Sequence, residues 1–204
     1  MFLSEYINES WNRLLQECEL SRHYNLLNGP ISARNPILDA ILPSLLHVKA
    51  VVILDEALVE YLNIYNIRPP KKKYPNTLFG RINFFADHGH LVDAKEMHKV
   101  RGRRNDIAHQ SEDTVDWKVL DDDMASIEIE LAHLGFVGPR PNYEFYSSRS
   151  RAADSDDPDI AMVFDCRCGV KVDDQPVLEI SWNLNVYRIG RNQVPKTGAV
   201  TSED

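Results

Sequence analysis

The side chains best suited to chemistry on an anion lie close together in the segment Val-Arg-Gly-Arg-Arg-Asn-Asp-Ile-Ala-His, residues 100–109. The pattern predicts a helix in which Met97, Val100 and Ile107 share an apolar face and Arg104 interrupts that face. Burying an unpaired guanidinium is expensive. Arg104 should therefore meet a paired carboxylate, a subunit interface or a cleft that receives an anion, and the sequence leaves these alternatives open.

Asn105 and His109 lie one helical turn apart, so the Asn105 amide can hydrogen-bond the imidazole of His109 and fix its tautomer. Imidazole suits proton transfer because its pKa, near 6.5, lies close to cellular pH. Arg104 and His109 are about 140° apart around the helix axis. A long side chain, a local distortion or a second subunit must bring them together, and this geometry favours a groove between two chains.

The six residues Arg-Asn-Asp-Ile-Ala-His, 104–109, resemble the Arg-x4-6-His motif of the HEPN superfamily. In that motif a polar residue, often Asn, follows the arginine and a small residue precedes the histidine. The expected order of helices over residues 4–137 fits the same family. The resemblance implies a homodimer in which the motifs of two protomers meet in a shared cleft and cut RNA without a metal or other cofactor.

The resemblance also implies a role for each motif residue. His109 would act as general base or acid on the ribose 2′-hydroxyl and the leaving group, and Arg104 would stabilise the charge on the pentacoordinate phosphorus. Asn105 would orient His109 or contact the phosphate. The products would be a 2′,3′-cyclic phosphate and a free 5′-hydroxyl. A toxin or phage-defence effector of this kind would have a cognate antitoxin or an activating partner.

Two other functions compete with this endoribonuclease. The first is a catalytically inactive HEPN-like module that binds nucleic acid or protein, in which Arg104 and His109 only hold the dimer together. The second is a metal-dependent hydrolase. Its candidate ligands are His88, His90 and His98 with Asp87 or Asp93, and they match no recognised ligand spacing.

The basic residues are unevenly distributed along an acidic chain whose formal net charge is −8. Between Arg68 and Arg104 there are ten lysines and arginines but only three acidic residues. A basic segment in an acidic protein is suited to a local polyanion site. We therefore expect phosphate contacts, without sequence choice, from five residues: Lys71, Lys72, Lys73, Arg101 and Arg103.

The apolar periodicity predicts an α+β chain, with an N-terminal HEPN-like bundle of about five helices and then a small β region. The helices are expected over residues 4–27, 35–65, 76–87, 91–110 and 114–134, with Asn76 as a helix cap. Alternating patterns predict a three-stranded antiparallel meander over 143–146, 160–166 and 177–187, with a mobile connection over 147–158. The expected divisions are 1–138, 139–190 and a disordered tail over 191–204.

Composition bounds the location of the protein. Residues 1–5 lack the basic and apolar marks of a secretory signal, and the most apolar stretch, residues 37–54, is interrupted by polar residues. The three cysteines, Cys18, Cys166 and Cys168, match no zinc signature and fit a reducing compartment. The sequence thus predicts a cytoplasmic protein without a membrane role.

Overall fold

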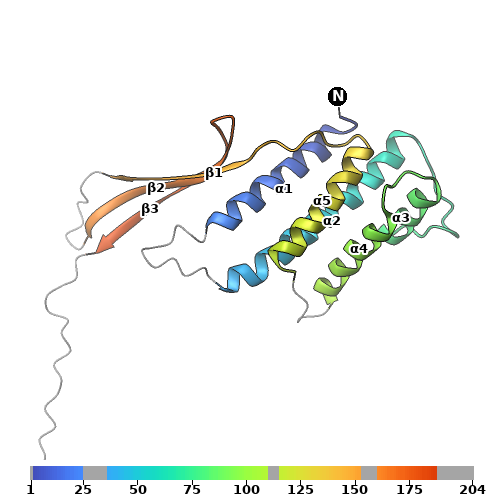
Figure 1. The fold of residues 1–204 in the computed structure, drawn as a ribbon, viewed down its shortest axis with the longest axis horizontal. Coiled ribbons are helices and arrows are strands. Elements are labelled where there is room, and N and C mark those ends of the chain that lie inside the picture. Colours follow the sequence, from blue (N-terminus) through green and yellow to red (C-terminus); the bar gives the residue numbers. More distant parts are fainter. Residues whose placement is uncertain (1, 25–35, 110–114, 153–159, 188–204) are drawn as a thin grey trace, which may run out of the picture.

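The computed structural model describes residues 2–24, 36–109, 115–152 and 160–187, with side chains left undescribed at 24, 36–39, 161 and 187. Five helices come first: α1 (Glu5–Tyr24), α2 (Pro36–Ile64), α3 (Leu78–Asp87), α4 (Ala94–His109) and α5 (Trp117–His133). An antiparallel sheet follows, with β1 (Glu144–Arg151), β2 (Ile160–Val172) and β3 (Gln175–Tyr187) in the order β1-β2-β3. This confirms the predicted α+β arrangement (Figure 1).

The helices pack around one apolar core. Helix α2 is central and contacts α1, α3, α4 and α5, while α3 and α4 form a pair on the side of the bundle away from the sheet (Figure 1). The largest fully buried side chains come from every helix and from the segment after α5, and include Trp11, Leu58, Phe85, Met97, Leu131 and Phe136. None of the described helices is long and apolar enough to cross a membrane.

Several helices begin later than the sequence predicted, at polar side chains that cap them. Thr77, not Asn76, caps α3 by accepting a hydrogen bond from Gly80 N at 3.3 Å. Asp93 accepts from Glu96 N at 2.9 Å at the start of α4, and Asp116 accepts from Val119 N at the start of α5. The predicted end of the first helix, residues 25–27, lies outside the described residues.

The sheet is a meander whose strands are longer than predicted. Residues 147–151, expected in a mobile connection, pair with residues 164–168 of β2, and β2 itself extends past its predicted end to Val172. Asp173 and Asp174 both have positive φ, as a tight two-residue hairpin requires. Residues 153–159 of that connection and the predicted tail, 191–204, lie outside the described residues.

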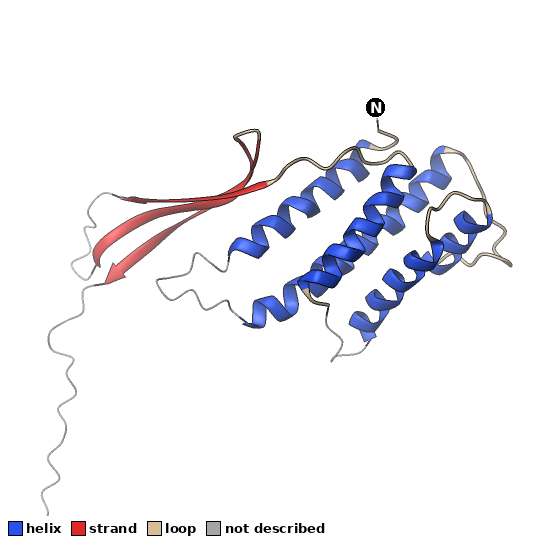
Figure 2. Ribbon diagram, viewed as in Figure 1, coloured by secondary structure: helices blue, strands red, loops and turns tan. Residues whose placement is uncertain are grey.

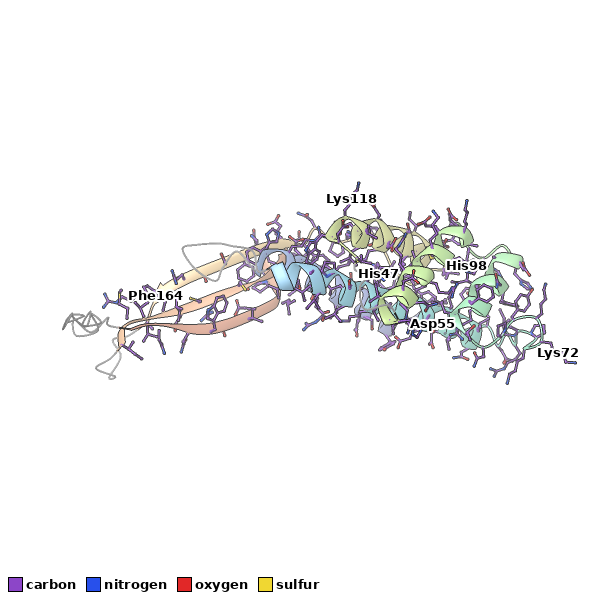
Figure 3. All side chains as sticks on the ribbon, turned by 90° about the horizontal axis from the view of Figure 1, so that it is seen from below. His47, Asp55, Lys72, His98, Lys118 and Phe164 are labelled. Atoms are coloured by element: carbon purple, nitrogen blue, oxygen red, sulfur yellow. The ribbon has the colours of Figure 1, made fainter. Side chains whose placement is uncertain are left out.

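The sheet packs against α1 and extends away from the bundle (Figure 2). Near the bundle, Cys168 and Val170 are buried, and the Phe145 ring stacks on His23 of α1 with 4.8 Å between centroids. Phe164 lies on the part of the sheet that projects outward, at the opposite end of the molecule from Lys72 (Figure 3). The sheet is therefore remote from α4, which carries Arg104, Asn105 and His109 (Figure 1).

Candidate functional site

A cleft of about 570 Å³ opens between α2, α3 and α4. Helix α4 contributes Arg101, Arg104 and Asn105 to its lining. The other walls come from α2 and from the start of α3: Val51, Val52, Asp55, Glu56, Thr77, Leu78, Phe79 and Arg81. A cleft of this volume accepts a ligand of nucleotide size. Two of the three predicted catalytic residues therefore face the same open space.

Arg104 is half-buried, and among the described residues its guanidinium has no carboxylate partner. Its Nη1 donates to the Asn105 Oδ1 at 3.3 Å. The hydrogen bond predicted between Asn105 and His109 is absent among the described residues, where the Asn105 carbonyl oxygen accepts from Arg104. Of the three environments considered for Arg104, the structure excludes a paired carboxylate within the described part of the chain and provides a cleft.

His109 lies one turn beyond Asn105, at the end of α4, and its side chain is exposed. It does not line the cleft, and no described residue contacts its ring through a hydrogen bond or ion pair. The structure of a single chain therefore separates His109 from the space that Arg104 and Asn105 share. The angular mismatch seen in the sequence persists in the folded chain.

Arg101 and Phe79 form the wall of the cleft where α3 meets α4. The Arg101 guanidinium lies over the Phe79 ring, 5.2 Å from its centroid, which is within the roughly 6 Å range of cation–π contacts. The Arg101 Nε is buried without a hydrogen-bond partner among the described residues. Phe79 nevertheless stays 45% exposed.

His98 supports this wall from behind. Its ring lies 5.2 Å from the Phe79 ring, and its Nε2 is 3.1 Å from the Oδ1 of Asn83. Burial, together with the positive charge of Arg101, lowers the pKa of His98 below its usual value. His98 is therefore neutral at cellular pH, with Nε2 donating to Asn83.

Arg81 and Asp55 close the cleft on the α2 side. Arg81 donates from both Nε and Nη2 to the Asp55 carboxylate, each at 2.7 Å, and from Nη1 to Asn76 at 2.9 Å. A bidentate pair holds the guanidinium in one orientation. Asp55 is thereby neutralised, and three arginines face two carboxylates in the cleft lining.

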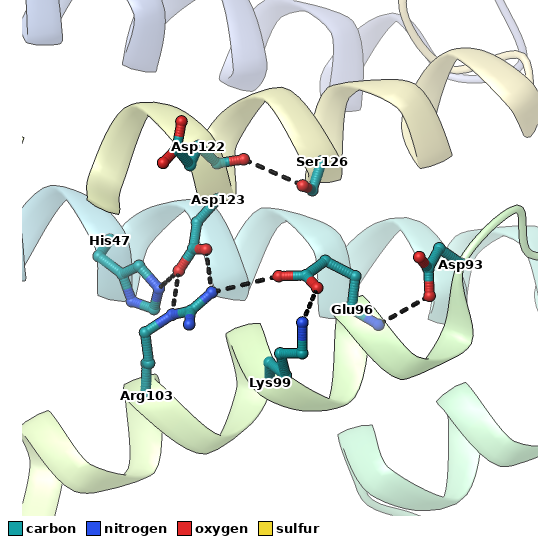
Figure 4. A network of polar contacts seen from close by, with 8 residues as sticks. All are labelled: His47, Asp93, Glu96, Lys99, Arg103, Asp122, Asp123 and Ser126. Atoms are coloured by element: carbon teal, nitrogen blue, oxygen red, sulfur yellow. Dashed lines mark hydrogen bonds and ion pairs between the residues drawn. The ribbon is translucent and has the colours of Figure 1, made fainter. Parts of the chain in front are cut away.

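Arg103 points to the other side of α4, into the bundle. It forms a bidentate ion pair with Asp123 of α5, whose carboxylate also accepts from the buried His47 Nε2 at 2.7 Å (Figure 4). Glu96 lies 3.4 Å from the Arg103 Nη2 and holds Lys99. Burial opposes ionisation of Asp123, but the hydrogen bonds from His47 and Arg103 outweigh it and lower its pKa. Arg103 thus joins α4 to α5 instead of lining the cleft.

The three predicted lysines are in the loop between α2 and α3, at the end of the molecule remote from the sheet (Figure 3). Lys71 and Lys72 are exposed and have no partner among the described residues. Lys73 pairs with Asp87 at 2.9 Å and lies over the Tyr74 ring. Lys71 also lines a second cleft, of about 250 Å³, which shares Arg81 with the first.

The histidines considered as metal ligands do not converge. His88 and His90 stack with 6.5 Å between their ring centroids, whereas His98 turns toward Asn83. Within the described residues, no three His, Cys, Asp or Glu side chains are grouped so that they could hold a metal ion. The structure therefore gives the metal-dependent hydrolase no assembled site in this part of the chain.

Sequence reasoning missed Phe79, the Asp55–Arg81 pair and the role of His47. A signal existed for two of them. Phe79 lies outside the apolar spacing of Leu78, Ile82 and Phe85, which marks an aromatic residue facing away from the core. His47 interrupts an apolar helix, and a buried imidazole needs a partner. The Asp55–Arg81 pair joins positions 26 residues apart, and no local pattern indicates it.

No protein-family model matches the chain, and neither a curated protein nor a solved structure is significantly similar to it. The chain has an α+β fold with a helical bundle and a three-stranded antiparallel sheet, and the cleft between α2, α3 and α4 is the candidate site.

Proposed function

We propose that the chain is a metal-independent endoribonuclease of HEPN type that acts as a homodimer. The observation that carries this proposal is the cleft, into which α4 presents Arg104 and Asn105 side by side with no carboxylate partner for Arg104 among the described residues. An unneutralised guanidinium in a cleft is a receptor for an anion such as a phosphodiester. The resemblance of residues 104–109 to the HEPN motif supplies the reaction.

The exposed position of His109 supports a site shared between two copies. Within one chain His109 lies outside the cleft, so the cleft has no imidazole from its own α4. A second chain that lies nearby can supply its His109 to that cleft. Helix α4 exposes no large hydrophobic side chain over its described length, whereas α2 exposes four along one flank: Ile41, Leu45, Val52 and Val59. Val52 also lines the cleft. We therefore place the two-fold contact on α2 beside α4.

The resemblance to the HEPN motif implies the following reaction at these side chains. The ribose 2′-oxygen attacks phosphorus while His109 takes its proton, and the P–O5′ bond breaks as the leaving oxygen gains a proton from an imidazole. Arg104 faces the non-bridging oxygens, where negative charge accumulates in the transition state. Asn105 holds Arg104 through its carbonyl oxygen and keeps its amide N–H groups for the phosphate. The products are a 2′,3′-cyclic phosphate and a 5′-hydroxyl.

The test is cleavage of a mixed-sequence single-stranded RNA in the presence of EDTA, with the 3′ ends of the products identified by mass. The expected result is a 2′,3′-cyclic phosphate from the wild type and a rate lower by about 10²- to 10⁴-fold in His109→Ala. His133→Ala is the matched control, because His133 ends α5 and is exposed but lies outside the cleft. Cleavage that EDTA abolishes, or that His109→Ala leaves intact, contradicts the proposal.

One observation favours a second candidate, a HEPN-like module that binds RNA without cutting it. His109 has no partner among the described residues that would orient its ring, as a histidine prepared for proton transfer usually has. Binding of RNA by the wild type with no product in the same assay would select this candidate.

A further inference from the structure

Phe79 is an exposed aromatic residue for which neither the core nor the proposed cleavage step accounts. It is the second residue of α3, and its neighbours Leu78 and Ile82 pack toward the core. Phe79 instead lines the cleft and keeps 45% of its surface exposed. A large apolar ring in a cleft that also presents arginines is suited to a ligand with both a flat apolar surface and negative charge.

The ring is held in place from the side of α4. The Arg101 guanidinium lies 5.2 Å from its centroid, and His98, itself bound to Asn83, lies 5.2 Å from it. These contacts restrict rotation of the ring while leaving it open to the cleft. A ring fixed before binding loses little conformational entropy when a ligand stacks on it.

The charged groups around Phe79 match the backbone of the same ligand. Arg101 carries a buried Nε without a partner among the described residues, and Arg104 has no carboxylate there. Both line the cleft with Phe79. Nucleotides combine a flat base with a phosphate, and proteins that bind single strands pair aromatic rings with basic side chains for this reason.

We infer that Phe79 is a stacking platform for one unpaired base, and that the cleft takes single-stranded RNA in preference to duplex. This rests on the proposed function only in that RNA is the ligand. A base in a duplex is stacked on its neighbours and must be unpaired and turned out before it can reach Phe79, which costs free energy. A single strand pays no such penalty. Stacking uses the flat face of a base and not its hydrogen-bonding edges. The cleft should therefore prefer single strands while discriminating little between sequences.

The inference also gives Arg101 a role distinct from that of Arg104. Arg101 packs on Phe79 and so contacts the nucleotide whose base is stacked, whereas Arg104 is held by Asn105 at the predicted reacting phosphate. Arg101 is a positioning residue for the bound strand. The Lys71-containing second cleft shares Arg81 with the first, so the strand can continue toward the basic loop.

The test measures binding and not cleavage. The probe is a fluorescein-labelled 2′-O-methyl RNA of about twelve nucleotides, within the range of single-strand site sizes, and its methyl groups block attack by the 2′-oxygen. Phe79→Ala should weaken binding of the single strand by about 5- to 150-fold, the range that base–aromatic stacking gives. Phe79→Trp should retain binding. Val92→Ala is the matched control, since Val92 is exposed and lies outside the cleft.

Two further measurements sharpen the outcome. Abasic nucleotides at every position of the probe, which leave no base to stack in any register, should weaken binding to the wild type, and Phe79→Ala should then weaken it no further. The same probe annealed to its complement should bind more weakly than the single strand, and Phe79→Ala should change that binding little.

The inference is overturned if the wild type does not bind the probe, if Phe79→Trp is as weak as Phe79→Ala, or if single strand and duplex bind equally. It is also overturned if light scattering shows that the Phe79→Ala variant has become monomeric and that this accounts for its lost binding. That result would assign Phe79 to a subunit interface. A protein that binds the probe through Phe79 but cuts no RNA keeps the inference and refutes the proposed function. A Phe79→Ala variant that binds and cuts RNA as well as the wild type keeps the proposed function and refutes the inference.

Discussion

Arg103 and Arg104 are neighbours in the sequence and have opposite surroundings in the fold. Arg103 turns into the bundle, where the buried Asp123 and His47 meet it (Figure 4). Arg104 turns into the cleft, where its only hydrogen-bond partner in the described structure is the amide of Asn105. The same side-chain type therefore holds helices together on one side of α4 and faces open space on the other. A buried acidic partner on another helix distinguishes a structural arginine from a candidate functional one.

The largest expected effect is a difference in the free energy of unfolding between variants of these two arginines. Arg103→Ala leaves the Asp123 carboxylate buried with His47 alone, and should lower the free energy of unfolding by about 3 kcal/mol. This is the lower end of the usual range, because a third of the Arg103 side chain is exposed. Arg104→Ala removes no buried ion pair and should change the free energy by less than about 0.5 kcal/mol. Urea unfolding of both variants, followed by circular dichroism, measures the difference. Equal losses of unfolding free energy in the two variants would show that Arg103 and Arg104 do not differ in structural role.

The second prediction uses the low pKa of Asp123. Because the folded-state pKa lies below the unfolded value of about 3.9, the ionised carboxylate contributes stability above that pH. The contribution is lost as the pH falls through the folded pKa. Asp123→Asn should therefore be less stable at neutral pH and should show a shallower decline in acid, by up to about 1.4 kcal/mol per pH unit. Urea unfolding between about pH 2 and pH 6 measures both slopes. If the free energy of unfolding changes with pH in the same way in the wild type and in Asp123→Asn, Asp123 does not titrate in this range.

The smallest expected effect concerns the basic loop. Lys71 and Lys72 have no partner among the described residues, whereas Lys73 is engaged with Asp87 and Tyr74. Changing Lys71 and Lys72 together to Gln should weaken RNA binding a few-fold and reduce the slope of log affinity against log salt by about 1.4, or 0.7 for each single-strand phosphate contact. Lys73→Gln should have less effect. A larger loss from Lys73→Gln would show that its ion pair opens to receive RNA.

The sequence predicted the elements well where periodicity was strong, and the site only in part. All five helices and the three strands were expected from apolar spacing, and the differences lie at their ends, where Thr77, Asp93 and Asp116 act as caps. Helix spacing put Arg104 on the apolar face of α4 and left its partner open, and the cleft is known only from the fold. The sheet was extended beyond its predicted ends because strand length depends on the partner strand, which lies far away in the sequence.

The partners of the charged residues could not be predicted, because they depend on contacts between distant helices. Arg103 was expected to bind RNA, and its bond to Asp123 spans 20 residues between α4 and α5. Charge alone made Arg101 and Arg103 equivalent in the sequence. Phe79 became a candidate only when the fold placed it beside Arg101. The angle between Arg104 and His109, in contrast, was given by helix geometry alone, and the folded chain retains it.

That separation leads to the most direct measurement of the central claim, that Arg104 of one chain acts with His109 of a second chain on RNA. Arg104→Ala and His109→Ala should each be inactive alone. When the two variants are unfolded together and refolded, half of the dimers pair one variant with the other, and each of these regains one of its two sites. The mixture should then recover about a quarter of the wild-type cleavage rate. A mixture that forms mixed dimers and stays inactive would show that no site is shared between chains, and would contradict the account.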